Sequence, residues 1–234
     1  MADDVCRKGN IIWSGTYRNV LTMPRQIATW EEQIRLILNE IERTQCGRLL
    51  IGDIHKNGHR MLIVPDPGTD INAATYSTNA RGAFPRGQFS DSTGSGCSTI
   101  IELTPSNYSV RSGVFSAADT ALFHEMCHGL HDMCGRSEAN LTLGGDFDTL
   151  DEFWAITLTN IYVSERHYPG LRADHHGRTQ LEPRLCDSQA FYDWATEAVG
   201  LVCQSAPEFT RGIARVPASF NPIKVYWDAR TSRH

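Results

Sequence analysis

The segment ALFHEMCHGLHDMCG, residues 121–135, constrains the fold of this chain more than any other segment. It places three histidines, one glutamate and two cysteines within fifteen positions. On a helix, His124 and His128 stand one turn apart on the same face, so their imidazoles can converge on one cation. Glu125 lies roughly 100° round the helix, from where its carboxylate can reach a water held by the metal without being a ligand. The segment therefore predicts a helix that carries a metal-binding H-E-x-x-H arrangement.

The residues that flank this segment set the limits of the predicted helix. Ser116 is followed three places later by Asp119, which is a typical N-terminal capping pattern, and Gly135 is the residue type that commonly follows a helix end. These signals predict a helix over about residues 117–134. The alternative interpretation is that its histidines are hydrogen-bonded structural side chains on a half-buried helix, as in a non-catalytic binding module.

The length and composition are those of a folded globular protein. The chain has 234 residues, of which 41% are hydrophobic and 21% charged, and its formal net charge is −5. It contains no run of about 18 apolar residues and no block rich in Lys or Arg, so we expect neither a membrane span nor a nucleic-acid partner. We predict an N-terminal arm over residues 1–27 and one domain over residues 28–234.

The first part of the predicted domain contains a helix and a hairpin signal. Residues 29–46, TWEEQIRLILNEIERTQC, repeat their apolar side chains with a helical period. Thr29 and Glu32 form a capping box at the start of this segment, and Gly47 supplies a stop. Two apolar runs then flank the Asn-Gly pair at 57–58, which is a strong hairpin signal. The sequence therefore predicts a helix followed by a β-hairpin.

The rest of the chain alternates between a long loop, a strand and helices. Residues 66–97 are rich in Gly, Ser, Asp and Asn and predict a long loop with one short strand. Residues 97–105, CSTIIELTP, are typical of a strand. Two further helices are predicted over about 150–166 and 187–204. This order predicts an α+β fold with a small antiparallel sheet and a helix that carries the active site.

The cysteines do not form a recognisable framework. There are seven, an odd number, they are scattered along the chain, and no C-x-x-C spacing occurs. We therefore expect thiols in a reducing compartment rather than disulfides or a zinc ribbon. The seven are Cys6, Cys46, Cys97, Cys127, Cys134, Cys186 and Cys203.

A catalytic zinc site needs a third protein ligand and an open position. The segment TLDEFWAITLTNIY begins at Thr149 and offers Glu152, which follows His128 by enough residues for a loop and a returning helix. Glu152 is therefore the preferred third ligand, although Thr149 and Glu152 also form a capping box that would serve only the helix end. The other candidates are Asp151, Glu138, Asp148 and His175.

His131 is a less suitable ligand than its sequence position suggests. The extended pattern H-E-x-x-H-x-x-G-x-x-H fails, because His131 stands at its glycine position and Cys134 at its last histidine position. His131 shares a face with His124 and His128, but it lies about 4.5 Å further along the helix axis than His128. We expect His131 to neighbour the metal centre rather than to bind the metal.

The chemistry expected of such a centre is hydrolysis. Zinc lowers the pKa of a bound water, and Glu125 would take the proton as general base. A further donor should stabilise the oxyanion, and the candidates are His175 and His176, which we prefer, and Tyr162. The strand expected over 98–104 could pair with an extended peptide and present its scissile bond to the metal.

Three segments together are similar to bacterial effector-type zinc metallopeptidases. They are HEMCH (124–128), DEFWAITLTNIYVSE (151–165) and LRADHHG (171–177), and the resemblance covers roughly residues 95–185. This group includes NleD-like type III effectors and the metallopeptidase domains at the ends of VgrG and Rhs proteins of type VI secretion. Cys127 and Cys134 depart from the pattern, and a disulfide at either cysteine would distort the site.

The resemblance implies a zincin-like fold in which His124, His128 and Glu152 bind zinc and Glu125 is the base. It also implies a toxin that acts on a protein or peptide substrate and is opposed by a cognate immunity protein. Such a toxin is cytoplasmic in its producer and is delivered into a target cell by a dedicated secretion apparatus. The start of the chain, MADDVCRKGN, is in keeping with this expectation, because it lacks the apolar core of a signal peptide.

A second enzymatic interpretation keeps the metal and changes the substrate. A zinc amidase that acts on cell-wall peptide would use the same centre, and the sequence does not separate the two activities. A strand edge that can pair with a peptide would favour a protein substrate, whereas a wide polar cleft would favour a wall polymer.

Overall fold

The computed structural model describes residues 6–68, 73–79, 83, 94–108, 117–137, 147, 149–174 and 179–232. In chain order the elements are β1 (Cys6–Lys8), β2 (Ile11–Trp13), η1 (Tyr17–Asn19), α1 (Pro24–Arg43), α2 (Gln45–Lys56), β3 (Met61–Val64), β4 (Ala73–Ser77), β5 (Thr99–Leu103), η2 (Pro105–Asn107), α4 (Ala118–Cys134), α5 (Leu150–Glu165), η3 (Pro183–Cys186), α6 (Ser188–Trp194), α7 (Thr196–Ser205), α8 (Pro207–Ile213) and α9 (Pro222–Thr231).

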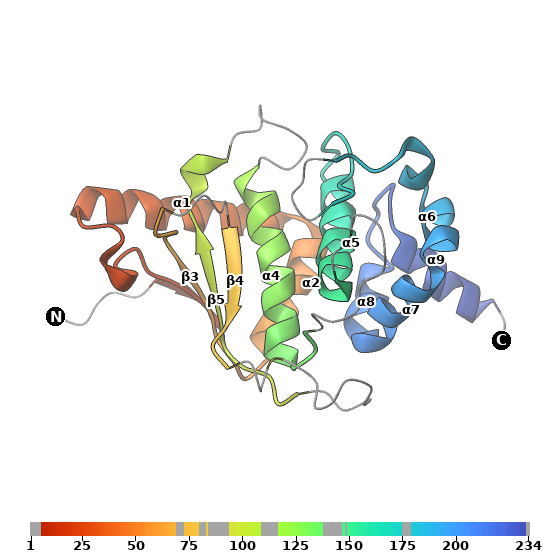
Figure 1. Ribbon diagram of the computed structural model, residues 1–234, viewed down its shortest axis with the longest axis horizontal. Coiled ribbons are helices and arrows are strands. Elements are labelled where there is room, and N and C mark those ends of the chain that lie inside the picture. The colour runs from red at the N-terminus through yellow and green to blue at the C-terminus, as the bar shows by residue number, and fades with distance from the viewer. Residues whose placement is uncertain are drawn as a thin grey trace.

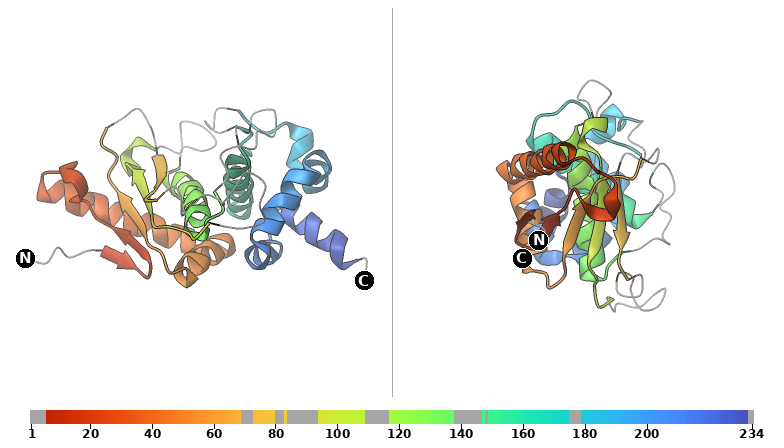
Figure 2. Two further views of the ribbon diagram at one scale, coloured as in Figure 1. Left: turned by 60° about the horizontal axis from the view of Figure 1, so that its bottom comes forward. Right: turned by 90° about the vertical axis from the view of Figure 1, so that its left-hand side faces the viewer.

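These elements form an α+β fold, as predicted. The sheet lies to one side, α4 and α5 cross the middle, and α6 to α9 lie on the far side of α5 (Figure 1). The left-hand view of Figure 2 preserves this order. Among the helices in the described part of the chain, none combines the length and the apolar character that a membrane crossing needs.

The sheet is mixed, so the prediction of an antiparallel sheet is wrong. Its strand order is β1-β2-β3-β5-β4. The pairs β2–β3 and β3–β5 are parallel, and only the outer pairs β1–β2 and β4–β5 are antiparallel. The parallel β2–β3 pair requires a long crossover connection, which α1 and α2 supply. Residues 6–13, within the expected N-terminal arm, thus contribute two strands to the sheet.

The order of the strands also decides which strand has a free edge. β5 lies between β3 and β4, so both of its edges are already paired. The prediction that an extended peptide pairs with the strand at 98–104 is therefore wrong. The strand at this end of the sheet is β4, which pairs only with β5 among the described strands.

The hairpin predicted at 57–58 is also wrong, because its first half is the helix α2. Cys46, Leu50 and Ile54 recur every four residues on the buried face of α2, which is a helical rather than a strand period. Asn57 ends the helix, and its side chain donates to the main-chain carbonyl of Met133 at 3.0 Å. The Asn-Gly pair therefore ends a helix that is tied to the end of α4.

The helix predicted over 29–46 begins earlier and ends earlier. It starts at Pro24, and Thr29 lies inside it, where its hydroxyl donates to the carbonyl of Arg25 at 2.8 Å. The predicted capping box is therefore wrong. The chain breaks at Thr44, whose side chain accepts from the N–H of Gly47 and so caps α2. Gly47 lies inside α2, against the carbonyl of Ile41, where a Cβ would lie 1.9 Å from that oxygen.

The helices that carry the site follow the predictions more closely. α4 and α5 match the helices predicted over 117–134 and 150–166 to within one residue, and β5 lies inside the strand predicted over 97–105. Gly135 ends α4 with φ 65°, the left-handed conformation that favours glycine. The helix predicted over 187–204 is instead two helices, α6 and α7, separated at Ala195. Ser116 lies outside the described residues.

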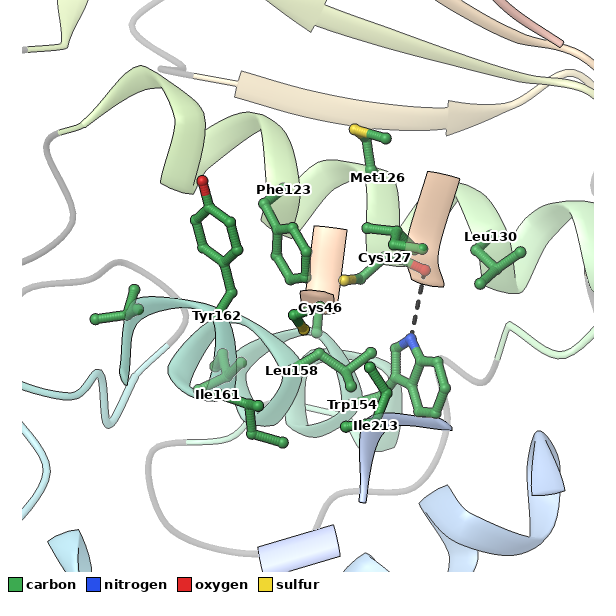
Figure 3. Packing of buried hydrophobic residues seen from close by; sticks show 14 of the residues in the cluster. Cys46, Phe123, Met126, Cys127, Leu130, Trp154, Leu158, Ile161, Tyr162 and Ile213 are labelled. Carbon is green, nitrogen blue, oxygen red and sulfur yellow. Dashed lines mark hydrogen bonds between the residues drawn. The ribbon is translucent and has the colours of Figure 1, made fainter. Parts of the chain in front are cut away.

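α4 is clamped between the sheet and α5. At Gly129 a Cβ would lie 2.6 Å from the terminal methyl of Met61 and 3.0 Å from a methyl of Thr99, so α4 approaches β3 and β5 closely. On its other side, Trp154 of α5 donates from its indole to the carbonyl of Cys127 (Figure 3). Every side chain of α5 from Phe153 to Ser164 is buried. Both helices are therefore fixed in depth and in rotation.

The end of α5 also reaches α2. The Glu165 carboxylate accepts from the main-chain N–H groups of Gln45 at 2.6 Å and Cys46 at 2.9 Å. These amides lack partners within their own helix, and a carboxylate at a helix N-terminus is also favoured by the helix dipole. Residues about 120 positions apart thereby complete one helix end.

Candidate metal centre

Two histidines and one glutamate meet between α4 and α5. His124 and His128 project from one face of α4, and Glu152 projects from the first turn of α5. The Nε2 atoms of the two histidines are 3.1 Å apart. The Glu152 carboxylate places one oxygen 3.5 Å from Nε2 of His124 and the other 3.3 Å from Nε2 of His128. Among the residues that the structure describes, these three form a group that could hold a metal ion.

The separations suit a small tetrahedral cation. Zinc binds histidine nitrogen and carboxylate oxygen at about 2.0–2.2 Å, so neighbouring ligand atoms of a tetrahedral site lie about 3.3–3.5 Å apart. The distance between the two Nε2 atoms and the distance from each to its nearer Glu152 oxygen fall close to this range, although a different oxygen of the carboxylate is nearest each histidine. Two imidazoles and one carboxylate are also a ligand set that zinc commonly has in catalytic sites.

The start of α5 explains how Glu152 serves both the helix and the centre. The Thr149 hydroxyl accepts from the main-chain N–H of Glu152 at 3.1 Å, so the cap uses the backbone of this residue. The carboxylate is left to face the histidines. The two interpretations of Glu152, as a helix cap and as a ligand, are therefore compatible in this geometry.

Asp151, an alternative ligand in the sequence analysis, instead orients two histidines. One of its oxygens lies 2.5 Å from Nδ1 of His128, and the other lies 2.5 Å from Nδ1 of His131. Each Nδ1–H donates to the carboxylate, so the lone pair of His128 resides on Nε2, where a metal would need it. His131 stacks on Trp154, with ring centroids 4.2 Å apart. His131 lies beside the group that could hold a metal and is not part of it, as expected.

His124 is oriented from its other nitrogen. The Thr159 hydroxyl lies 3.4 Å from Nδ1 of His124 and donates its own proton to the carbonyl of Ala155 at 2.7 Å. Its oxygen is therefore available to accept from an Nδ1–H, but the Arg172 guanidinium, which can only donate, lies 3.3 Å from the same nitrogen. The two neighbours of Nδ1 favour opposite tautomers of His124. Both histidines nevertheless turn Nε2 toward the carboxylate of Glu152.

Glu125 lies beside this group on α4 and is half-buried. Its carboxylate accepts a 2.7 Å hydrogen bond from the hydroxyl of Thr75 on β4. The same hydroxyl lies 3.1 Å from the main-chain carbonyl of Glu125. Glu125, the predicted general base, is thus hydrogen-bonded to β4 at the end of the sheet.

The electrostatic environments of the two histidines differ. Burial, followed by the positive charge of Arg172, lowers the pKa of His124 to about 4. Burial also lowers the pKa of His128, but the charge of Asp151 and the hydrogen bonds to Asp151 and Glu152 outweigh it and raise that pKa well above its ordinary value. Without a metal, the His128 ring is therefore protonated on both nitrogens and positively charged at neutral pH, whereas the His124 ring is neutral.

The two acids that face these histidines, Asp151 and Glu152, have lowered pKa values. Burial raises the pKa of Asp151 and of Glu152, but the neighbouring histidines outweigh burial and lower both pKa values below their ordinary range. Both carboxylates are therefore ionised at neutral pH. They also lie in the first turn of α5, where the helix dipole favours negative charge.

Tyr162 is not part of the centre, and its assignment as an oxyanion donor is wrong. Its hydroxyl donates to the carboxylate of Asp119 at 2.6 Å, at the opposite end of the contact between α4 and α5. Its ring is fully buried and stacks on Phe123 (Figure 3). The other predicted candidates, His175, His176, Glu138 and Asp148, lie outside the described residues.

Two side chains that sequence reasoning missed lie beside the centre. The Arg172 guanidinium is buried and lies 3.3 Å from Nδ1 of His124. The Asn160 side chain bonds both the N–H and the C=O of Arg172 at 2.8 Å, which docks this segment on α5. Arg172 belongs to the LRADHHG segment, so a signal was present, but the histidine pair obscured it.

The second missed residue is Tyr108, which follows β5. Its hydroxyl oxygen is buried and has no hydrogen-bond partner among the described residues. Burial, followed by the negative charges of Glu125 and Asp66, raises its pKa, and Arg172 opposes that rise. This hydroxyl therefore remains protonated and lies in the same electrostatic environment as Glu125 and Arg172. No sequence signal singles it out.

The cysteines take no part in the centre. All seven are free. Cys127 follows the glutamate in the H-E-x-x-H segment, but its side chain points toward Cys46 of α2 (Figure 3). Burial raises the pKa of Cys127 well above its ordinary value, and Cys46 contributes to this rise. Cys127 therefore packs as a small apolar side chain.

Comparison with known proteins gives no family for the chain. No family model, no curated protein and no solved structure matches it. The zincin-like fold and the likeness to effector metallopeptidases therefore remain predictions.

Proposed function

We propose that this chain is a zinc-dependent metallopeptidase. The observation that carries the proposal is the convergence of His124, His128 and Glu152, in which the two Nε2 atoms are 3.1 Å apart and each lies 3.3–3.5 Å from an oxygen of the carboxylate. Two features support it. Asp151 holds His128 in the tautomer that a metal needs, and Glu125 lies next to the three proposed ligands without joining them.

Zinc held by these residues would supply Lewis acidity, which acidifies water and polarises a carbonyl group. Glu125 is the general base in this mechanism and removes the proton from the attacking water. As the C–N bond of the substrate breaks, Glu125 returns that proton to the amine nitrogen, so that a carboxylate and an amine are released. Its half-buried position allows contact with both the water and the leaving group.

The oxyanion that develops on the substrate needs donors. We assign this role to the Arg172 guanidinium and the Tyr108 hydroxyl, because both are buried beside the centre. A fixed positive charge and a preorganised hydroxyl stabilise developing negative charge strongly in a site that excludes water. His175 and His176 remain predicted donors in the same segment as Arg172.

A peptide is the substrate that the architecture favours. β4 lies at the end of the sheet and carries Thr75, which contacts Glu125. An extended peptide that added to this strand would run past the base, in the manner of β-strand addition. The resemblance noted in the sequence supports the further proposal of a delivered bacterial toxin with a cognate immunity protein.

The proposal is tested by metal analysis and proteolysis with the purified chain. We expect about one zinc per chain, and loss of peptide hydrolysis in Glu125→Gln with zinc retained. Zinc-free protein that does not take up the metal would overturn the proposal. Incubation of the wild type with unfolded proteins and, separately, with cell-wall fragments distinguishes a peptidase from a wall amidase. Cleavage of wall fragments alone would be consistent with the proposed metal centre but would contradict a protein substrate.

A further inference from the structure

We propose that Thr75 is a positioning residue for the base. In this proposal β4 fixes the orientation of the Glu125 carboxylate as well as the path of the substrate. This inference rests on the proposed function. The observation behind it is the contact between two elements that are remote in sequence. The hydroxyl of Thr75 on β4 donates to the carboxylate of Glu125 on α4 at 2.7 Å.

The direction of Thr75 follows from the register of the sheet. Thr75 is paired with Ile101 of β5, and paired residues of an antiparallel ladder point to the same face. Thr99, two residues before Ile101 and on the same face of β5, approaches Gly129 of α4, so Ile101 and Thr75 also face α4. Tyr76, the next residue, points to the opposite face and is 46% exposed. Of these neighbours on β4, Thr75 is the residue placed to reach the base.

A threonine suits this task better than a longer side chain would. Its β-branch restricts rotation about χ1, so the hydroxyl is held in place by the strand backbone. The hydroxyl has one proton and two acceptors within reach, the carboxylate at 2.7 Å and the main-chain carbonyl of Glu125 at 3.1 Å. Both acceptors belong to the same residue, and the shorter bond is to the charged group, which is the stronger acceptor.

The frame around this contact is rigid. Gly129, one turn after Glu125, lets α4 approach the sheet closely. The Asp132 carboxylate then fastens the same helix to β5 through the hydroxyl of Thr99 at 3.4 Å. The backbone of Glu125 is therefore fixed independently of Thr75. What Thr75 adds is the orientation of the carboxylate relative to the strand along which a peptide would lie.

The test compares Thr75→Val with Thr75→Ser and with Thr78→Val. Valine keeps the shape of threonine and removes the hydroxyl, whereas serine restores the hydroxyl. Thr78 is a matched control, because its hydroxyl donates to the main-chain carbonyl of Ser98 at 2.7 Å and does not contact Glu125. All variants are checked for zinc content, which we expect to be unchanged.

The first measurement needs no activity. The infrared carboxylate band of Glu125 is identified in the metal-free protein as the band that disappears in Glu125→Gln. We expect Thr75→Val to shift this band, Thr75→Ser to restore it, and Thr78→Val to leave it in place. An unshifted band in Thr75→Val would overturn the inference, because the hydrogen bond would then be absent in solution.

The second measurement is the kinetics of peptide cleavage. We expect Thr75→Val to lower kcat about 10- to 100-fold with little change in KM, since misplacing a catalytic group by a fraction of an ångström has effects of this size. Thr75→Ser should recover most of the loss. Unchanged kcat in Thr75→Val, or an equal loss in Thr78→Val, would overturn the inference alone. A zinc-bound wild type that cleaves no peptide would overturn the proposed function, and the catalytic role of Thr75 with it.

Discussion

The contact between α4 and α5 carries a buried polar cluster at each end, and the two clusters differ in kind. At one end, the Asp119 carboxylate accepts from the hydroxyl of Tyr162 at 2.6 Å and from the guanidinium of Arg166 at 2.9 Å. The hydroxyl and the guanidinium supply protons, and the carboxylate accepts them. In this first cluster the negative charge of the carboxylate is balanced by donors of the protein itself, so it requires no bound ion.

The second cluster, at the other end, brings acceptors together. The Nε2 atoms of His124 and His128 and the carboxylate of Glu152 all face one another, within 4.8 Å. Buried acceptors that converge in this way are favourable only around a proton or a cation. The same two helices thus build a structural network and a candidate metal site, and the difference lies in whether donors and acceptors balance.

The largest expected effect is on metal binding by the second cluster. Replacing Glu152 with Ala should weaken zinc binding by more than about 100-fold, since even outer partners of metal ligands contribute about 10- to 100-fold. Competition with a chromophoric chelator measures this affinity. Asp119→Asn is the matched control in the first cluster and should leave zinc affinity unchanged. Full affinity in Glu152→Ala would mean that the third ligand lies elsewhere.

A smaller loss is expected where the hydrogen bonds of the ligands are changed and the ligands are kept. Asp151→Asn should weaken zinc binding about 10- to 100-fold, because His128 loses the carboxylate that orients its ring. His131→Gln, which leaves the Asp151–His128 contact in place, should have a smaller effect. Equal losses in the two variants would show that Asp151 acts through general packing.

The protonation of the two histidines gives the next prediction. Without metal, His128 holds a proton at pH 7, because its pKa is raised well above the ordinary value, whereas His124, with a pKa of about 4, does not. Zinc binding should therefore release about one proton, and affinity should rise about tenfold per pH unit until the pKa of His128 is passed. Calorimetry in buffers of different ionisation enthalpy counts the protons. Release of two protons would contradict the inferred difference in protonation between His124 and His128.

The smallest effect is expected in the first cluster and concerns folding rather than metal. Tyr162→Phe should reduce the free energy of unfolding by about 1 kcal/mol, because Arg166 still satisfies Asp119. Zinc affinity should not change. Urea unfolding at pH 7 measures the difference, and a loss of zinc in this variant would break the distinction between the clusters.

Tyr162 also predicts a dependence on alkaline pH. Burial, followed by Asp119, raises the pKa of its hydroxyl above the ordinary value of 10.0. The folded state therefore keeps the proton when the unfolded state loses it. The resulting stability is fully present below about pH 10 and is lost as the pH rises further. Tyr162→Phe should lose less stability than the wild type between neutral pH and about pH 11.

The sequence predicted the second cluster better than the sheet that faces it. His124 and His128 lie on one helix and Glu152 lies beside a capping signal, so their spacing in the sequence was enough to identify them as candidates. The hairpin was mistaken because the Asn-Gly pair at 57–58 is a strong local signal, whereas the helical period of α2 extends over a longer segment. Parallel pairing of β2, β3 and β5 depends on crossovers that no local pattern contains.

The residues that the sequence missed share one property. Thr75 and Arg172 reach the centre through contacts between segments that are 50 and 48 positions apart, respectively. A threonine in a strand carries no signal by itself, and the one signal for Arg172, its place in the LRADHHG segment, drew attention to the histidine pair instead. Long-range packing decides their roles, and a single sequence does not encode it in readable form.

The Glu165 carboxylate that completes the start of α2 also bears on the timing of folding. During synthesis, α2 emerges from the ribosome long before residue 165 is added, so its first amides must remain hydrated while the chain lengthens. The corner between α1 and α2 can close fully only when α5 arrives, and α5 also carries Glu152. A chain that ended before α5 would therefore lack both the carboxylate that caps α2 and the third of the proposed metal ligands.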